Sequence, residues 1–316
     1  MKRFWLAVVL AGISFLACAQ SYPSKPIRIV VPFAPGGPTD VVARLLSVKL
    51  PELLGQPVLV ENRPSSTGNL GTAQVAKAPA DGYTVLVNSS AFAVNVTLSP
   101  TAGYEPADFT PVVQVATQPN LIVVNAAFPA KSLAELLELA KTQKLAYASP
   151  GTGTTPHLTA EHLFRLLAKA DVVHVPHKGA GPAATAVVAG EPPIGSLAVT
   201  APIPYIRSGR LRALAISSTR RHPLLPEVPT FIELGYPQIQ DYTWVGMFAP
   251  AGTPPEAVHK LNEAVNRAIQ MPDIRERLES LTFEPIGGSP QQFADYVRAE
   301  VAKWGKVVRE TGARAD

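Results

Sequence analysis

The chain has 316 residues, which is enough for two domains of ordinary size and few for three. Hydrophobic residues make up 47% of it and charged residues 16%, which excludes a disordered chain because disorder combines low hydrophobicity with high charge. It contains 28 Lys and Arg against 24 Asp and Glu, too even a balance for a nucleic-acid-binding surface, so we expect no nucleic acid partner.

Residues 1–19 have the pattern of a secretory signal peptide. Lys2 and Arg3 precede an apolar run over residues 4–16, which is short for a transmembrane helix. Ala17-Cys18-Ala19 then matches an A-x-A cleavage site, so we expect a mature chain that begins at residue 20 in the periplasm. Alternatively, Cys18 is retained and lipidated. It is the only cysteine, so we expect neither a disulfide nor a cysteine metal site.

Strands and helices alternate after this segment. Hydrophobic patterning predicts an amphipathic helix at 41–54 and strands at 27–31, 58–61, 84–87, 111–115 and 121–124. A second series has helices at 133–141, 157–167, 183–189 and 203–208, and strands at 145–148, 172–175 and 211–216. An irregular, proline-rich segment at 221–242 leads to a strand at 243–249 and to helices at 255–269 and 290–309, both beginning with proline. Ser132 and Glu135 predict a capping box before the helix at 133–141.

This alternation predicts an α/β fold with mostly parallel sheets and flanking helices. The two series separate near Asn120 and rejoin near Tyr242, which predicts two lobes with a ligand cleft between them. We expect residues 20–119 and 245–316 to form lobe 1 and residues 120–244 to form lobe 2.

The loop Pro32-Phe33-Ala34-Pro35-Gly36-Gly37-Pro38-Thr39-Asp40 runs from the first strand into the first helix. Ligands of open α/β sheets bind beyond the carboxyl ends of strands, and glycines let the backbone approach a ligand closely. The free N–H groups and the dipole of the following helix favour an anion. The loop could therefore receive a carboxylate without Lys or Arg. The alternative is a tight turn followed by an acidic residue, Asp40, that stabilises its own helix.

A second loop, Ser149-Pro150-Gly151-Thr152-Gly153-Thr154-Thr155-Pro156-His157, also joins a strand to a helix and adds hydroxyl donors. It is neither a dinucleotide fingerprint, because Pro156 replaces the third glycine, nor a P-loop, because no Gly-Lys-Ser/Thr follows. With one such loop in each lobe, the two could close on a ligand from both sides.

His157, Glu161 and His162 raise the question of a metal site. Their spacing is one residue longer than the inverted zincin motif, and His162 would point about 100° away from the other two on a helix. His157 is better suited to cap its helix or line the cleft. The sequence also has no G-x-S-x-G nucleophile elbow. We expect no metal, no cofactor and no catalytic residue, with an enzyme as a minor alternative.

Further stretches stand out along the chain: Tyr22-Pro23-Ser24-Lys25-Pro26-Ile27-Arg28, Glu61-Asn62-Arg63-Pro64, Ala80-Asp81-Gly82-Tyr83-Thr84, His174-Val175-Pro176, Lys178-Gly179, Pro229-Thr230 with Glu233 and Gly235, Ala249-Pro250-Ala251-Gly252-Thr253-Pro254 and Lys303-Trp304. Together with the two loops, they resemble in order the receptors of tripartite tricarboxylate transporters, the Bug family of solute-binding proteins. The resemblance covers nearly the whole mature chain.

The resemblance implies a two-lobed periplasmic-binding-protein fold of the Venus-flytrap, type II-like kind, without catalytic activity. It implies a small organic acid as ligand, gripped partly through water, and docking onto the membrane permease subunits of a tripartite transporter. Carried over by position, the ligand-binding residues are Phe33, Ala34, Gly36, Gly37, Thr39, Ser149, Gly151, Gly153, Thr154 and His157. We expect a monomer, and burial at Phe33 and Trp244 to add affinity.

Two positions depart from the family pattern. His177 stands where Val-Pro-Tyr-Lys-Gly has tyrosine, and Gly190-Glu191-Pro192-Pro193-Ile194 lacks the aspartate of Gly-x-Val-Asp. The specificity of a relative therefore does not transfer to this chain. A sensor that presents its ligand to a membrane kinase is the main alternative to a transport receptor.

Overall fold

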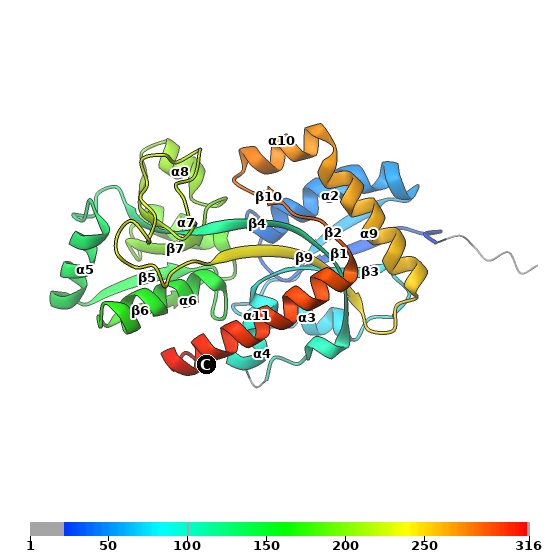
Figure 1. Ribbon diagram of the computed structural model, residues 1–316, viewed down its shortest axis with the longest axis horizontal. Coiled ribbons are helices and arrows are strands. Elements are labelled where there is room, and N and C mark those ends of the chain that lie inside the picture. The colour runs from blue at the N-terminus through cyan, green and yellow to red at the C-terminus, as the bar shows by residue number, and fades with distance from the viewer. Residues whose placement is uncertain (1–21, 100, 315–316) are drawn as a thin grey trace, which may run out of the picture.

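The structure of the protein is a computed structural model that describes residues 22–99 and 101–314. It consists of two α/β lobes joined by two long neighbouring strands (Figure 1). The predicted signal peptide and Cys18 lie outside the described residues.

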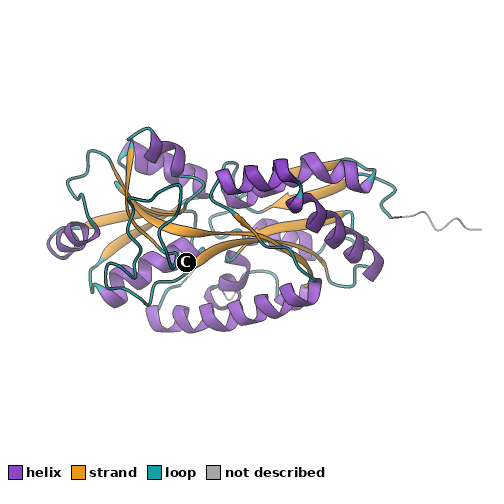
Figure 2. Ribbon diagram, turned by 45° about the horizontal axis from the view of Figure 1, so that its top comes forward, coloured by secondary structure: helices purple, strands orange, loops and turns teal. Residues whose placement is uncertain are grey.

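Lobe 1 is built on a parallel sheet in which β1 (Ile27–Val31) lies between β2 (Val58–Asn62) and β3 (Thr84–Ser89). Helices cover both faces of this sheet, so β3 is buried at every position (Figure 2). The accompanying helices are α2 (Pro38–Leu54), α3 (Asn69–Ala76), α4 (Ala91–Leu98), the 3₁₀ turn η1 (Pro106–Asp108), α9 (Pro255–Gln270), α10 (Pro272–Ser280) and α11 (Pro290–Thr311).

Lobe 2 repeats the plan, with β5 (Leu145–Ser149) between β6 (Val172–Pro176) and β7 (Ile194–Ala198) in parallel. The remaining elements are α5 (Leu133–Thr142), α6 (Thr155–Glu161), the π-helical turn η2 (His162–Leu167), α7 (Ala180–Ala189), α8 (Ile203–Arg207) and β8 (Leu211–Ile216). Because each parallel strand ends at the cleft edge of its sheet, the loops that follow β1, β3 and β5 face the other lobe.

The connection between the lobes consists of β4 (Phe109–Asn125) and β9 (Tyr242–Pro250). β4 pairs with β9 from Phe109 to Pro119 and with β7 from Asn120 onward. These pairings are antiparallel, as are those of β4 with β8 and with the short strand β10 (Glu284–Pro285). The sheet is therefore mixed, with parallel strands inside each lobe and antiparallel strands between them.

Some local predictions were wrong, and two of them concern a connecting strand and a helix cap. The strands predicted at 111–115 and 121–124 are the single strand β4, which accommodates Pro111 because its register with β9 shifts at that point. The predicted capping box is incomplete: Ser132 Oγ accepts from the Glu135 amide at 3.2 Å, but the Glu135 carboxylate accepts from the Lys131 amide at 2.7 Å. That amide lies one residue before the cap.

A small apolar cluster also joins the lobes beside the connecting strands. It unites Leu158 of α6 with Val94 and Leu98 of α4 and with Trp304 and Val308 of α11. All five side chains are buried. The last turns of α11 thus contact lobe 2, as the course of that helix in Figure 1 indicates.

Candidate ligand-binding site

The loop between β1 and α2 is fixed from behind by Asp40. This buried carboxylate accepts from the Gly36 amide at 3.0 Å, from Asn62 Nδ2 at 2.9 Å and from Arg44 Nε at 3.0 Å. Asn62 also donates to the Phe33 carbonyl at 3.0 Å. Gly36 has φ +89°, a left-handed conformation that favours glycine. With Asp40 bound to the loop, the N-terminus of α2 keeps its remaining N–H groups for a ligand.

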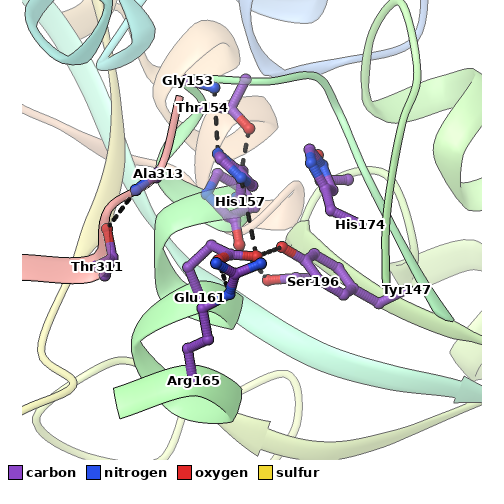
Figure 3. A network of polar contacts seen from close by, with 12 residues as sticks. Tyr147, Gly153, Thr154, His157, Glu161, Arg165, His174, Ser196, Thr311 and Ala313 are labelled. Atoms are coloured by element: carbon purple, nitrogen blue, oxygen red, sulfur yellow. Dashed lines mark hydrogen bonds and ion pairs between the residues drawn. The ribbon is translucent and has the colours of Figure 1, made fainter. Parts of the chain in front are cut away.

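The loop after β5 is held by Thr154 and His157. Thr154 caps α6: its Oγ1 donates to the Gly151 carbonyl at 2.8 Å and accepts from the His157 amide at 3.4 Å. His157 Nδ1 accepts from the Gly153 amide at 3.2 Å (Figure 3). The imidazole therefore shapes this loop from the inside.

The histidines of this region are neutral. His157 stacks on His174 with ring centroids 4.1 Å apart, and His174 Nε2 lies 2.6 Å from Ser149 Oγ. Burial, and after it the neighbouring His174 and Arg165, lower the pKa of His157 well below its usual value. Burial and His177 lower the pKa of His174 to about 4. At neutral pH neither ring supplies a positive charge, so an anion here depends on N–H and O–H donors.

A third helix N-terminus, that of α7, meets the first loop across the cleft. The Ala34 amide donates to the Lys178 carbonyl at 2.8 Å, which is a direct hydrogen bond between the lobes. Next to it, a Cβ added to Gly181 would lie 2.7 Å from the Pro35 carbonyl. A Cβ added to Gly151 would collide with the Ser66 carbonyl. The backbones of the two lobes thus approach each other closely at glycines, where no side chain stands between them.

Between these loops lies a small cavity. In the described part of the chain, every residue that lines it is uncharged. The lining residues are Phe33, Gly37, Pro38, Thr39, Ser89, Pro150, Thr154, Thr155, Pro156, Ala180, Ala198 and Thr243. Gly37, Thr154 and Ala180 stand at the first turns of α2, α6 and α7, so the N-termini of helices from both lobes meet at one cavity.

Four of the ten predicted binding residues line this cavity: Phe33, Gly37, Thr39 and Thr154. The other six lie behind the wall and shape the loops or join the lobes, namely Ala34, Gly36, Ser149, Gly151, Gly153 and His157. Trp244 was expected to add burial for the ligand, and this was wrong. Its side chain is fully buried in lobe 1, where Nε1 donates to Glu300 at 2.9 Å and the ring packs on Phe293.

Sequence reasoning missed the lining residues Ser89, Ala180, Ala198 and Thr243. Ser89 and Ala198 end β3 and β7, so the rule that sites lie beyond the carboxyl ends of strands could have found them. Ala180 was missed because α7 was expected to begin at residue 183. The Lys178-Gly179 stretch was the available signal for its true start.

The side chains of His157, Glu161 and His162 were considered above as metal ligands, and their surroundings can now be described. Among the residues that the structure describes, no group of three or more His, Cys, Asp or Glu side chains is arranged to hold a metal ion. Glu161 instead accepts from Tyr147 Oη at 2.7 Å and pairs with Arg165 at 3.0 Å (Figure 3).

Over residues 22–99 and 101–314, no helix combines the length and the apolar character needed to cross a bilayer.

A family model described as the tripartite tricarboxylate transporter family receptor matches residues 42–313. The chain belongs to this receptor family. The receptor is 41% identical over 314 residues to the UPF0065 protein in the tcbD-tcbE intergenic region of Pseudomonas sp. (strain P51), with 96% of this chain and 93% of that protein covered.

Two solved structures extend the comparison. The periplasmic binding protein BugD superposes on the receptor with a TM-score of 0.89 and 33% identity, covering 93% of this chain and all of that one (100%). R. palustris Rpa4515 with adipate has a TM-score of 0.89 and 35% identity, covering 93% of this chain and 99% of that one. The receptor is thus a solute-binding protein with the two-lobed periplasmic-binding-protein fold that its sequence predicts.

Proposed function

We propose that the receptor captures a small carboxylate in the cavity between its lobes and delivers it to the permease subunits of a tripartite transporter. The observation that carries this proposal is the meeting of helix N-termini from both lobes at a cavity lined by uncharged residues. Such N-termini attract anions through free N–H groups and the helix dipole. The adipate bound by Rpa4515, which is 35% identical, supports a carboxylate.

The energy of binding must come from several sources. One helix N-terminus contributes about 0.3–1 kcal/mol when exposed and up to about 2 kcal/mol when partly buried. A micromolar ligand needs about 8 kcal/mol, so even three such ends are insufficient. Hydrogen bonds from hydroxyls such as that of Thr39, water-mediated contacts and burial against the Phe33 ring supply the rest.

Binding is coupled to closure of the lobes. The Ala34–Lys178 hydrogen bond and the contact of Gly181 with the first loop exist only when the lobes touch. A ligand that contacts both lobes favours this closed arrangement because it gains contacts there that the open form does not offer. Small-angle scattering should therefore report a smaller radius of gyration with ligand than without it. The same radius in both would contradict closure.

The finer assignments belong to the same proposal. Residues 20–119 with 245–316, and residues 120–244, move as the two lobes. Four of the predicted residues contact the ligand and the other six hold the loops. Residues 1–19 direct export to the periplasm, where the receptor acts as a monomer without catalytic activity.

A thermal-shift screen of the chain from residue 20 onward tests the proposal. The ligands are mono-, di- and tricarboxylates, aromatic acids and amino acids, with the matching neutral amides as controls. A ligand at about a hundred times its Kd stabilises the folded state by about 2.7 kcal/mol, which raises the melting temperature by several degrees. Stabilisation by acids alone supports the proposal. Stabilisation by an amide but by no acid would reject the carboxylate and keep the binding protein.

A further inference from the structure

A groove on the surface crosses the strands that join the lobes, and we call it the hinge groove. Its floor is the stretch of β4 from Thr117 to Pro119, together with Tyr242 at the start of β9. Residues 218–224 of lobe 2 form one wall. Residues of α10, of β10 and of the turn between them, all in lobe 1, form the other wall. The groove therefore spans the boundary between the lobes.

The hinge groove and the ligand cavity lie on opposite faces of the connecting strands. Successive side chains of a strand point to opposite faces. In β9, Tyr242 lines the groove, and the next residue, Thr243, lines the cavity. The Tyr242 hydroxyl accepts from the Thr219 amide in the groove wall at 3.3 Å, whereas the Thr243 hydroxyl bonds to Thr155 of α6 at 2.8 Å. The strands on which the lobes pivot therefore separate the groove from the cavity.

This arrangement couples the hinge groove to closure of the lobes. Two bodies that pivot on a strand pair approach each other on one face of the pair and move apart on the other. When the cavity closes, the two walls of the groove therefore separate, because each wall belongs to a different lobe. The closed receptor has the wider groove, so a group that fills the groove favours the closed form over the open one.

The lobe 2 wall of the groove carries positive charge. It contains Arg220 and Arg221 and no acidic residue, and burial lowers the pKa of His222, which leaves that side chain neutral at neutral pH. Arg221 pairs with Glu233 at 3.0 Å. Over residues 22–99 and 101–314, no acidic side chain lies within ion-pair distance of Arg220, which is exposed. Arg220 is thus available to a carboxylate of a partner.

The lobe 1 wall carries a negative charge in return. Arg275 and Glu279 pair with each other at 2.9 Å. Glu284 is exposed, and the described part of the chain gives it no ion-pair partner. A small anion drawn to Arg220 would be repelled by Glu284 across the groove. The two free charges instead fit a polypeptide segment that carries both an acidic and a basic side chain.

We propose that the permease recognises the solute-loaded receptor at the hinge groove, through a segment with an acidic residue facing Arg220 and a basic residue facing Glu284. This inference rests on the proposed function and names the surface that its partner contacts. A segment that fits only the wide groove binds the closed receptor better than the open one. Because such coupling is reciprocal, the bound solute strengthens docking by the same factor by which docking strengthens solute binding.

A bulky side chain in the groove tests the coupling on the receptor alone. Ser280→Trp places an indole at the end of α10, where the exposed serine lines the groove. Ser208→Trp is the matched control: Ser208 is also an exposed serine at a helix end that donates to the carbonyl three residues before it, but it lies outside the groove. Thr219→Trp fills the groove from the opposite wall.

Two measurements report the effect of the indole. We expect Ser280→Trp and Thr219→Trp to bind an acid found in the screen about 5- to 10-fold more tightly than the wild type, the upper value applying when about 10% of the free receptor is closed. Small-angle scattering without ligand should give both variants a smaller radius of gyration than the wild type. Ser208→Trp should match the wild type in both measurements.

Solute uptake tests the partner. In a host strain that lacks its own copy of this receptor, Arg220→Glu should lower uptake of the radiolabelled acid about 10-fold or more, because a like charge then faces the acidic residue of the permease. The purified variant should bind the acid as the wild type does, since Arg220 lies outside the cavity. Arg207→Glu, which changes an exposed arginine of lobe 2 outside the groove, should retain uptake.

Each outcome decides one part of the proposal. Wild-type affinity and radius in both groove variants, or an equal gain in Ser208→Trp, would overturn the coupling. Full uptake with Arg220→Glu would reject the groove as the docking surface. Binding of no acid by the wild type would reject the proposed function and the permease with it, whereas the radii of the ligand-free variants would still decide whether the groove controls closure.

Discussion

Gly181 offers a direct test of lobe closure, because a single methyl group at this position affects the closed form alone. It is the second residue of α7, and its φ lies outside the left-handed region, so alanine fits its backbone. In the helix, alanine is favoured over glycine by about 0.5–1 kcal/mol. Gly181→Ala should therefore leave lobe 2 folded and slightly more stable.

The cost arises across the cleft. The new Cβ would lie 2.7 Å from the Pro35 carbonyl oxygen, where ordinary contacts begin near 3.4 Å. The lobes would have to separate by a few tenths of an ångström or more, which also stretches the 2.8 Å bond from Ala34 to Lys178. Overpacking of this kind costs about 1–3 kcal/mol, which corresponds to a loss of about 5- to 150-fold in affinity.

Calorimetric titration with an acid found in the screen measures this loss, and thermal melting without ligand measures the stability of the variant. Thr185→Ala is the matched control, because Thr185 lies one turn further along α7 and its exposed side chain bonds only within that helix. Unchanged affinity in Gly181→Ala, or an equal loss in Thr185→Ala, would refute the argument.

Three further predictions concern the first loop and His174 of β6, which lies beside the second loop. Gly37→Val should abolish ligand binding, because the larger side chain would enter the cavity. Gly37→Ala should not, because a Cβ at Gly37 would lie at an ordinary 3.5 Å from Ala180. Equal affinities in the two variants would contradict this. Asp40→Ala should lower the free energy of unfolding in urea by about 1–3 kcal/mol and weaken ligand binding, because the Gly36 amide loses its acceptor. Unchanged values in both assays would show that Asp40 does not fix the loop. The pKa of His174 is lowered to about 4 in the folded protein, so its contribution to stability is complete above pH 6.5 and falls as the pH drops toward 4. His174→Gln should therefore flatten the plot of unfolding free energy in urea against pH over this window, where one site contributes at most about 1.4 kcal/mol per pH unit. The same plot for the variant and the wild type would speak against this reasoning.

The sequence predicted best those elements that carry a clear local signal. The helix at 41–54 was found because its apolar positions fall near helical spacing, and the strand at 27–31 because a short apolar run stands between Pro26 and Pro32. α4 was missed because it is buried almost all round, so its sequence has no polar face and no period. β4 was split in two because a strand that changes partners midway has no sequence signal of its own.

The residues of the site also differ in how well the sequence could predict them. The two loops could be predicted because Gly and Pro at a strand–helix junction restrict the backbone locally. Thr155 and Thr243 come together in the cavity wall only when α6 and β9 meet, and they are 88 positions apart along the chain. Such a contact is a property of the assembled fold, so no local pattern could report it.

The uninterrupted course of β4 has a consequence for how the receptor denatures. Residues at one end of this strand complete the sheet of lobe 1, and residues at the other end complete the sheet of lobe 2. When one lobe unfolds, its part of β4 loses its neighbouring strands and becomes disordered. The sheet of the other lobe, which pairs with the rest of β4, then has exposed hydrogen-bonding groups. Two lobes on separate linkers would melt in two steps. We expect this chain to give one calorimetric peak, whose van't Hoff enthalpy equals the heat absorbed.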